Sequence, residues 1–191
     1  MEGKYQVKWD NGIEYDGMIE DNKLHGDGTM TFNDGNIQKI EGVWTNDTLT
    51  KCNMLTMRDG STADNYDPVS GKLKGEGTVK VGASTYTGNW DEDGKLNGPG
   101  SIINDDNQGS FEGVFSNNVR NGPGVYKWPN NQGTYTGNFV NGMRDTSGTE
   151  GTGKMVWNTD EQEHVYEGQW KNGQCTVGLL DGNQVDQTVQ E

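Results

Sequence analysis

Hydrophobic and polar residues alternate over short stretches of this chain, and each stretch carries glycine at a fixed place. The phrase aromatic-x-Gly-x-aromatic reads YTGNW at 86–90, FEGVF at 111–115, YTGNF at 135–139 and YEGQW at 166–170. Alternate residues of a strand share one face, so the glycine and the two aromatic residues lie on the same side. The pattern predicts half-buried β-strands, in which each glycine leaves room for a ring to lie over bare backbone.

Weaker copies of this phrase are YDGMI at 15–19 and IEGVW at 40–44. A second phrase follows about eleven residues after the start of the first and consists of Gly-x-Gly and an alternating segment. Its copies are GDGTMTF at 26–32, GEGTVKV at 75–81, GPGSIIN at 98–104, GPGVYKW at 122–128 and GTGKMVW at 151–157. Asn-Gly and Asp-Gly steps, such as Asn141-Gly142, suit the turns between the strands.

The phrases recur every 24 or 25 residues in the regular part of the chain. This period predicts an array of about seven units over residues 1–178, irregular at 45–72, with a C-terminal cap or tail at 179–191. The residues expected to define the repeat are Tyr15, Gly17, Gly26, Gly28, Gly42, Trp44, Tyr86, Gly88, Trp90, Gly98, Gly100, Phe111, Gly113, Phe115, Gly122, Gly124, Tyr135, Gly137, Phe139, Gly151, Gly153, Tyr166, Gly168 and Trp170.

The two phrases in this order and spacing resemble the MORN (membrane occupation and recognition nexus) repeat, over roughly residues 3 to 178. Each unit reads as a β-hairpin, and one hairpin cannot bury its rings alone. Stacked copies can cover one another. We therefore expect an all-β fold, an elongated, single-layered solenoid of stacked β-hairpins.

The pattern fails or stretches in three places, at 45–72, 143–150 and 159–164. Insertions in repeat proteins map to loops, often on a binding face. We therefore expect that residues 143–147 can be deleted without loss of the fold, with partner binding weakened.

Composition narrows the classes of partner. The chain has a formal net charge of −14, and its fifteen Lys and Arg residues are scattered singly. This charge repels nucleic acids and anionic membranes, so other proteins with basic or neutral surfaces are the expected partners. No apolar stretch is long enough to span a membrane, and residues 1–12 contain no signal core. These features predict a cytoplasmic protein, and Cys52 and Cys175 are expected to be reduced thiols.

The sequence favours neither catalysis nor cofactor or metal binding. His25 and His164 lie in different repeats; we interpret His25 as structural and His164 as solvated in an acidic loop. The carboxylates are interpreted as a solvated acidic surface. Two Cys and two His that lie far apart in the sequence do not indicate a zinc site. The acidic segments 91–94 and 105–107 leave loose calcium binding as a weak alternative.

One face of the predicted strands carries Trp9, Phe32, Trp128 and Trp157. These rings are interpreted either as core stacking between repeats or as the lining of a groove for a peptide, because Trp and Tyr dominate interface hot spots. With residues of the two insertions, they make up the candidate protein-binding set, which is Trp9, Phe32, Trp128, Trp157, Met143, Arg144, Asp160 and Glu161.

The resemblance implies a non-catalytic protein-binding scaffold, a structural subunit of a larger cytoskeletal, ciliary or flagellar assembly. Two alternatives stay open, a phospholipid- or membrane-attachment module and a regulatory repeat subunit of an enzyme complex. The net charge argues against the membrane alternative. The open hairpin ends leave homodimerisation open as well.

Overall fold

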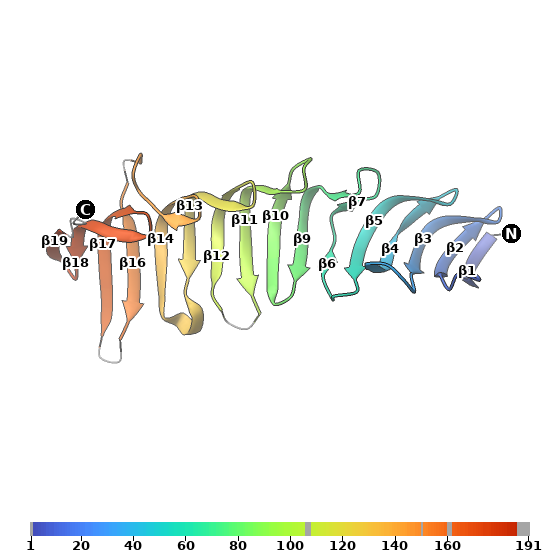
Figure 1. The fold of residues 1–191 in the computed structure, drawn as a ribbon, viewed down its shortest axis with the longest axis horizontal. Helices are drawn as coiled ribbons and strands as arrows, with labels where there is room; N and C mark the ends of the chain where they lie inside the picture. The colour runs from blue at the N-terminus through green and yellow to red at the C-terminus, as the bar shows by residue number, and fades with distance from the viewer. Residues whose placement is uncertain (1, 106–107, 150, 160–161, 187–191) are drawn as a thin grey trace. The chain divides into compact units, whose positions relative to one another are not determined.

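The computed structural model describes residues 2–105, 108–149, 151–159 and 162–186. The chain divides into two compact units, Met1–Lys95 and Leu96–Glu191. In both units, strands that follow one another in the sequence pair as antiparallel neighbours (Figure 1). The described residues form no α-helix, and their one helical turn is the 3-10 element η1 (Pro129–Asn131). The predicted all-β fold of sequential hairpins is confirmed.

The first unit is a sheet in which each strand pairs with the next, followed by a short accessory hairpin. Its strands are β1 (Glu2–Lys8), β2 (Glu14–Glu20), β3 (Lys23–Thr31), β4 (Ile37–Thr45), β5 (Thr48–Met57), β6 (Thr62–Ala63), β9 (Gly75–Val81) and β10 (Ser84–Trp90). The accessory hairpin consists of β7 (Tyr66–Asp67) and β8 (Lys72–Leu73). The irregular segment 45–72 therefore supplies β5, β6 and β7.

The second unit repeats the same arrangement more regularly. Its paired strands are β11 (Leu96–Asn104), β12 (Ser110–Ser116), β13 (Val119–Lys127), β14 (Gly133–Val140), β16 (Gly153–Asn158), β17 (Glu163–Lys171), β18 (Gln174–Leu180) and β19 (Asn183–Asp186). A two-residue strand, β15 (Met143–Arg144), also pairs with β14.

Tight turns join the two phrases of each repeat. Asn141 and Gly142 have φ values of 51° and 85°, and Asn117 and Asn118 have 51° and 69°. Two successive positive φ values are the geometry of two-residue hairpin turns, in which Asn, Asp and Gly cost least. Each turn is also tied to the preceding one: Asn118 accepts a hydrogen bond of 2.7 Å from the Leu96 backbone N–H.

A row of glycines crosses the second unit where the two phrases meet. Gly113 pairs with Gly100 on one side and with Gly124 on the other, and Gly137 pairs with Gly124. The first ring of each phrase lies on this row. An added Cβ on Gly113 would stand 2.7 Å from the Cζ of Phe111 and 2.6 Å from the Cα of Gly124. The sequence predicted that a ring would lie over the bare backbone of each glycine, and such a ring is present. At Gly113 it is the ring of Phe111, which belongs to the same strand as the glycine.

The rings of the second unit pack edge to face in an unbroken series. Consecutive centroids lie 5.0 to 5.3 Å apart, and the planes cross at 77° to 89°. This is a favoured aromatic geometry, worth about 0.5–1.5 kcal/mol per pair beyond area burial. The series runs in the order Phe115, Phe111, Phe139, Tyr135, Trp170 and Tyr166.

The first unit keeps one such pair, Tyr15 with Trp44, at 5.3 Å. Further along its sheet, Leu55, Ala63 and Val79 lie opposite one another on successive strands, and all three are buried. Ala63 lies where Phe111 and Tyr135 lie in the second unit. The ring series is therefore interrupted over the segment that lacks the glycine phrases.

The expectation that residues 143–147 form a removable surface loop is wrong. Asp145 and Thr146 are buried, and the Thr146 hydroxyl accepts a hydrogen bond of 2.9 Å from the Trp170 backbone N–H. Asn138 donates its side-chain amide to the Asp145 carbonyl at 2.9 Å. The segment fills the place where a regular repeat would continue its strand, so its removal would expose Trp170.

Candidate protein-binding pocket

A pocket of about 250 Å³ opens on the ring side of the second unit, between two successive hairpin turns. We call it the arginine pocket; it is lined by Arg120, Tyr126, Trp128, Phe139, Gly142, Met143, Arg144 and Gly173. Two of the chain's three arginines lie here. Arginine, aromatic residues and methionine are the residue types enriched in protein interfaces.

The turns position the two arginines. Gly142 donates its backbone N–H to the Arg120 carbonyl at 2.9 Å, and Gly173 donates to the Arg144 carbonyl at 2.8 Å. Each arginine is therefore held two residues beyond its own turn by the turn of the next repeat. Their side chains turn onto the rings because that face of the sheet holds the aromatic series.

Both guanidinium groups lie against rings. Arg120 is 5.5 Å from the centroid of Phe111, 5.4 Å from that of Tyr126 and 5.5 Å from that of Phe139. Arg144 is 4.4 Å from the nearest Trp170 centroid. Cation–π contacts of this kind are worth about 0.5–2 kcal/mol each.

Burial shifts the pKa values of two groups beside the pocket. Desolvation raises the pKa of the Tyr135 hydroxyl to about 12, with Arg144 acting in the opposite direction. Burial also lowers the pKa of the Arg144 guanidinium. An arginine nevertheless keeps its charge in proteins, so the pocket holds two cations.

Three residues of the sequence-predicted binding set line the pocket: Trp128, Met143 and Arg144. Met143 is 51% exposed, whereas Trp128 and Arg144 are half-buried. Sequence reasoning missed Arg120 and Tyr126. A signal for Arg120 was present, because Leu24 and Leu96 occupy the corresponding position of other repeats, and a change from leucine to arginine stands out in an aligned array.

The other candidates that the structure describes do not line this pocket. Trp9, 39% exposed, and Phe32 belong to the first unit. The Phe32 carbonyl accepts a hydrogen bond of 2.9 Å from Arg58. Trp157 lies in the second unit but does not line the pocket. Asp160 and Glu161 lie outside the described residues.

The sequence suggested a solvated His164, but its side chain is half-buried in the structure. Its ring stacks on Trp157 with centroids 5.3 Å apart, and its Nδ1 lies 2.8 Å from the Asp181 carboxylate. A strand partner explains the difference, because Trp157 stands directly opposite His164 in the β16–β17 pair. His25 is more exposed and lies 3.3 Å from Glu20.

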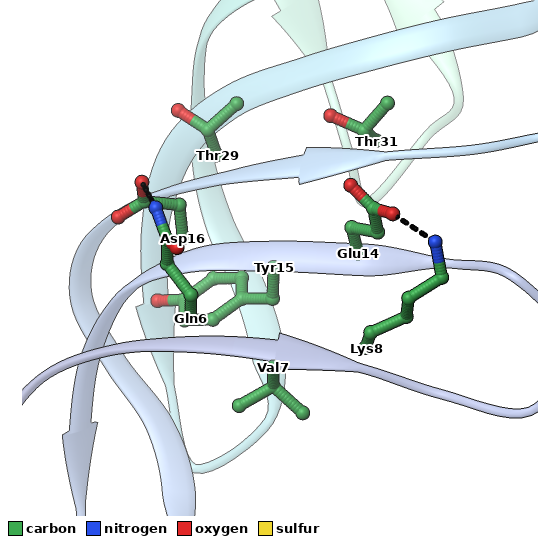
Figure 2. A pocket seen from close by; sticks show the side chains of 8 residues that line it. All are labelled: Gln6, Val7, Lys8, Glu14, Tyr15, Asp16, Thr29 and Thr31. Carbon is green, nitrogen blue, oxygen red and sulfur yellow. Dashed lines mark hydrogen bonds and ion pairs between the residues drawn. The ribbon is translucent and has the colours of Figure 1, made fainter.

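A shallow polar groove of about 380 Å³ lies in the first unit and serves as a contrast (Figure 2). Its charged groups are paired: Lys8 lies 2.5 Å from Glu14, and Asp16 lies 3.4 Å from Lys4 and accepts a hydrogen bond of 3.0 Å from Gln6. The hydrogen bond from Gln6 is the main cause of the lowered Asp16 pKa. This groove therefore has no unmatched charge to offer a ligand.

A third hollow, of about 370 Å³, lies in the first unit where the ring series is interrupted. Its lining includes Leu55, Ala63, Val79 and Leu73, and it overlaps the irregular segment.

Three further observations concern metal binding, membrane insertion and thiol chemistry. Within residues 2–105, 108–149, 151–159 and 162–186, no three His, Cys, Asp or Glu side chains cluster as metal ligands would. The described part of the chain also contains no helix of the length and apolarity needed to cross a membrane. Cys52 and Cys175 are thiols and form no disulfide with each other, and burial raises the pKa of the Cys52 thiol.

The fold and the periodic rings define a β-hairpin repeat protein. The sequence profile of the MORN repeat matches residues 15–37, 86–107, 111–133, 135–160 and 166–177, which together exceed half of the chain. The protein belongs to the MORN repeat family, with five matched repeats. No curated protein gave a match to the chain.

Proposed function

We propose that the protein is a non-catalytic scaffold that binds other polypeptides through the arginine pocket, as a structural subunit of a larger cytoskeletal or ciliary assembly. The observation that carries this proposal is the lining of the pocket, where two arginines, three aromatic rings and an exposed methionine converge. Such side chains dominate the energetic centres of protein interfaces. Family membership supports a repeat scaffold, and the assembly is inferred from what is typical of the family.

The test uses the full chain as bait in native extract, with quantitative mass spectrometry of the retained proteins. The bait is compared with Met143→Glu, which places a charge at the mouth of the pocket where the side chain is 51% exposed. Leu179→Glu is the matched control, because Leu179 is 49% exposed on β18 and does not line the pocket. We expect at least one protein to be retained by the wild type and by the control but lost from Met143→Glu.

A partner set that is identical for all three baits would contradict the use of this pocket. The membrane-attachment alternative is tested separately by flotation with phosphatidylserine and phosphoinositide vesicles. Each basic residue near an anionic surface contributes about 1 kcal/mol, and a net charge of −14 has the wrong sign. Vesicle binding at physiological salt would support that alternative over the scaffold. The regulatory-subunit alternative would show as an enzyme among the retained proteins.

A further inference from the structure

The two cations of the arginine pocket lack an anionic partner among the residues that the structure describes. The Arg120 guanidinium forms no hydrogen bond or ion pair with any residue that the structure describes and contacts only rings. Arg144 donates to the Gly173 carbonyl at 2.6 Å and to the Met155 sulfur at 3.5 Å, both neutral acceptors. The neighbouring Asp145 directs its carboxylate to Ser147 and to the backbone N–H of Asn172.

This arrangement is unusual for a chain with 29 acidic and 15 basic residues. Several lysines lie within 4 Å of a carboxylate, among them Lys8, Lys39 and Lys72. The chain therefore has acids available for pairing, and none of those that the structure describes lines the arginine pocket. A half-buried cation without an anion loses hydration that its ring contacts replace only in part.

The fold itself does not require arginine at position 120. Leu24 accepts the same turn hydrogen bond from Asp47 at 3.1 Å, and Leu96 accepts it from Asn118 at 3.0 Å, as Arg120 does from Gly142. Leu24 and Leu96 are 7% and 1% exposed. Leucine therefore satisfies both the backbone and the packing at this position, so the charge of Arg120 serves something other than the repeat.

We propose that the arginine pocket binds the carboxylate of a glutamate or aspartate side chain of a partner polypeptide. The inference rests on the proposed scaffold function and specifies what that pocket recognises. The carboxylate accepts hydrogen bonds from the guanidinium of Arg120 and from the free edge of Arg144, and the apolar stem of the acidic residue packs against Tyr126, Trp128 and Met143. Hydrogen bonds between ionised groups in a partly desolvated site are the strong class.

A polypeptide carboxylate fits the site better than a phosphate or a lipid headgroup. Apart from the arginines, the lining consists of rings, methionine and glycine, and it contains no lysine, serine or threonine to satisfy further phosphate oxygens. An anionic membrane would also meet the repulsion of the whole acidic chain, whereas one carboxylate inside the pocket meets mainly the two cations. The charge complementarity is therefore local.

The experiment selects ligands from a random peptide library displayed on phage and panned on the full chain. Selected peptides are synthesised, each together with a version in which Glu is replaced by Gln or Asp by Asn, and affinities are measured by fluorescence anisotropy. The protein variants are Arg120→Leu, which the leucine repeats show to fit the fold, and the control Lys127→Gln. Lys127 is exposed on β13. It stands between Tyr126 and Trp128 in the sequence, and these two residues line the pocket whereas Lys127 does not.

We expect the selected peptides to share an acidic residue next to an apolar one. Neutralising that residue and introducing Arg120→Leu should each weaken binding at least tenfold, with no further loss when the two changes are combined. Lys127→Gln should leave the affinity unchanged. Circular dichroism and the melting temperature establish that Arg120→Leu folds.

Three outcomes would overturn the inference. Selection of no peptide, or of peptides that bind Arg120→Leu as tightly as the wild type, rules out recognition of a carboxylate here. In that case, retention of proteins that depends on Met143 would still support the scaffold, so the two failures can be told apart. Arg120-dependent binding of inorganic phosphate or of phosphoinositide vesicles, stronger than that of the peptides, would assign the pocket to a phosphate instead.

Discussion

The Phe111 ring lies against Gly124, which belongs to the next strand of the sheet. A Cβ added to Gly124 would stand 2.6 Å from the Cε2 and Cζ atoms of the Phe111 ring. The ring has no free space to retreat into, because Phe115 and Phe139 pack against its edges. We therefore expect Gly124→Ala to lower the free energy of unfolding by about 1–3 kcal/mol, the usual cost of overpacking. Urea denaturation followed by tryptophan fluorescence measures it.

Gly151 provides the matched control for this change. It also belongs to a Gly-x-Gly phrase, but a Cβ there meets nothing within 4 Å, and its φ is not positive. Gly151→Ala should leave stability unchanged within about 0.5 kcal/mol, as is usual for surface substitutions. Equal losses for the two alanine variants would show that the ring is not what excludes a side chain at Gly124.

The glycine row could be predicted from the sequence because it follows from strand geometry. A glycine and the aromatic residues two positions away share one face, and this relation holds wherever the phrase occurs. The hairpin turns could also be predicted, because steps such as Asn141-Gly142 tolerate the positive φ values that these turns require. Regular spacing therefore conveyed the fold and the packing of its core.

The arginine pocket and the buried role of the insertion at 143–150 could not be predicted from the sequence. Arg120 follows a turn like any surface residue, and only the register of the neighbouring repeat shows that its side chain meets three rings. The insertion at 143–150 looked like a solvated loop because it is polar. The buried hydrogen bonds of Asp145 and Thr146 depend on partners 23 to 27 residues away, and local pattern does not report such contacts.

Thr146 offers a direct test of the buried role of that segment. Its hydroxyl accepts from the Trp170 backbone N–H at 2.9 Å and donates to Gln169 at 2.8 Å. Thr146→Val keeps the shape of the side chain but leaves the buried N–H without this partner, at a cost of about 1–3 kcal/mol. Thermal unfolding should show a lower melting temperature. Thr136→Val, at an exposed strand position, is the control, and an equal effect in both would count against the buried role.

Tyr135→Phe tests the raised pKa of the Tyr135 hydroxyl. The unfolded chain releases this proton near pH 10, whereas the folded protein holds it until about 12. The contribution to stability is therefore fully present below about pH 10 and falls between about pH 10 and pH 12. Phenylalanine fits the site, since Phe111 fills the corresponding position. The variant loses the hydrogen bond to the Asn138 carbonyl, about 0.5–1.5 kcal/mol at neutral pH.

Unfolding by urea at about pH 8 and about pH 11 measures the effect, because the two values fall below and within this window. The wild type should lose more stability between them than Tyr135→Phe does. Burial also raises the pKa of Tyr15 and Tyr166, so the variant retains a smaller alkaline loss. The same loss in both proteins would show that the Tyr135 hydroxyl has the same pKa in the folded and in the unfolded protein.

Asp181→Asn tests the carboxylate that closes the β18–β19 turn. Its oxygens accept from the Val165 backbone N–H at 2.8 Å and lie 2.8 Å from His164 Nδ1, and these interactions lower the Asp181 pKa. A lowered pKa gives stability that is present above the unfolded value of about 3.9 and is lost as pH falls through the folded value. Asparagine tolerates the φ of 48° at this turn, as Asn141 shows with its φ of 51°.

The melting temperature of Asp181→Asn should therefore lie below that of the wild type at about pH 7. The difference should shrink as the pH falls below about 3.9 towards the lowered folded pKa of Asp181. Asp21→Asn is the control, because Asp21 occupies a hairpin turn and its carboxylate has no hydrogen bond or ion pair to any described residue. It should match the wild type over the same pH range. A difference for Asp181→Asn that does not change with pH would mean that its carboxylate charge has no part in holding His164 and the turn together.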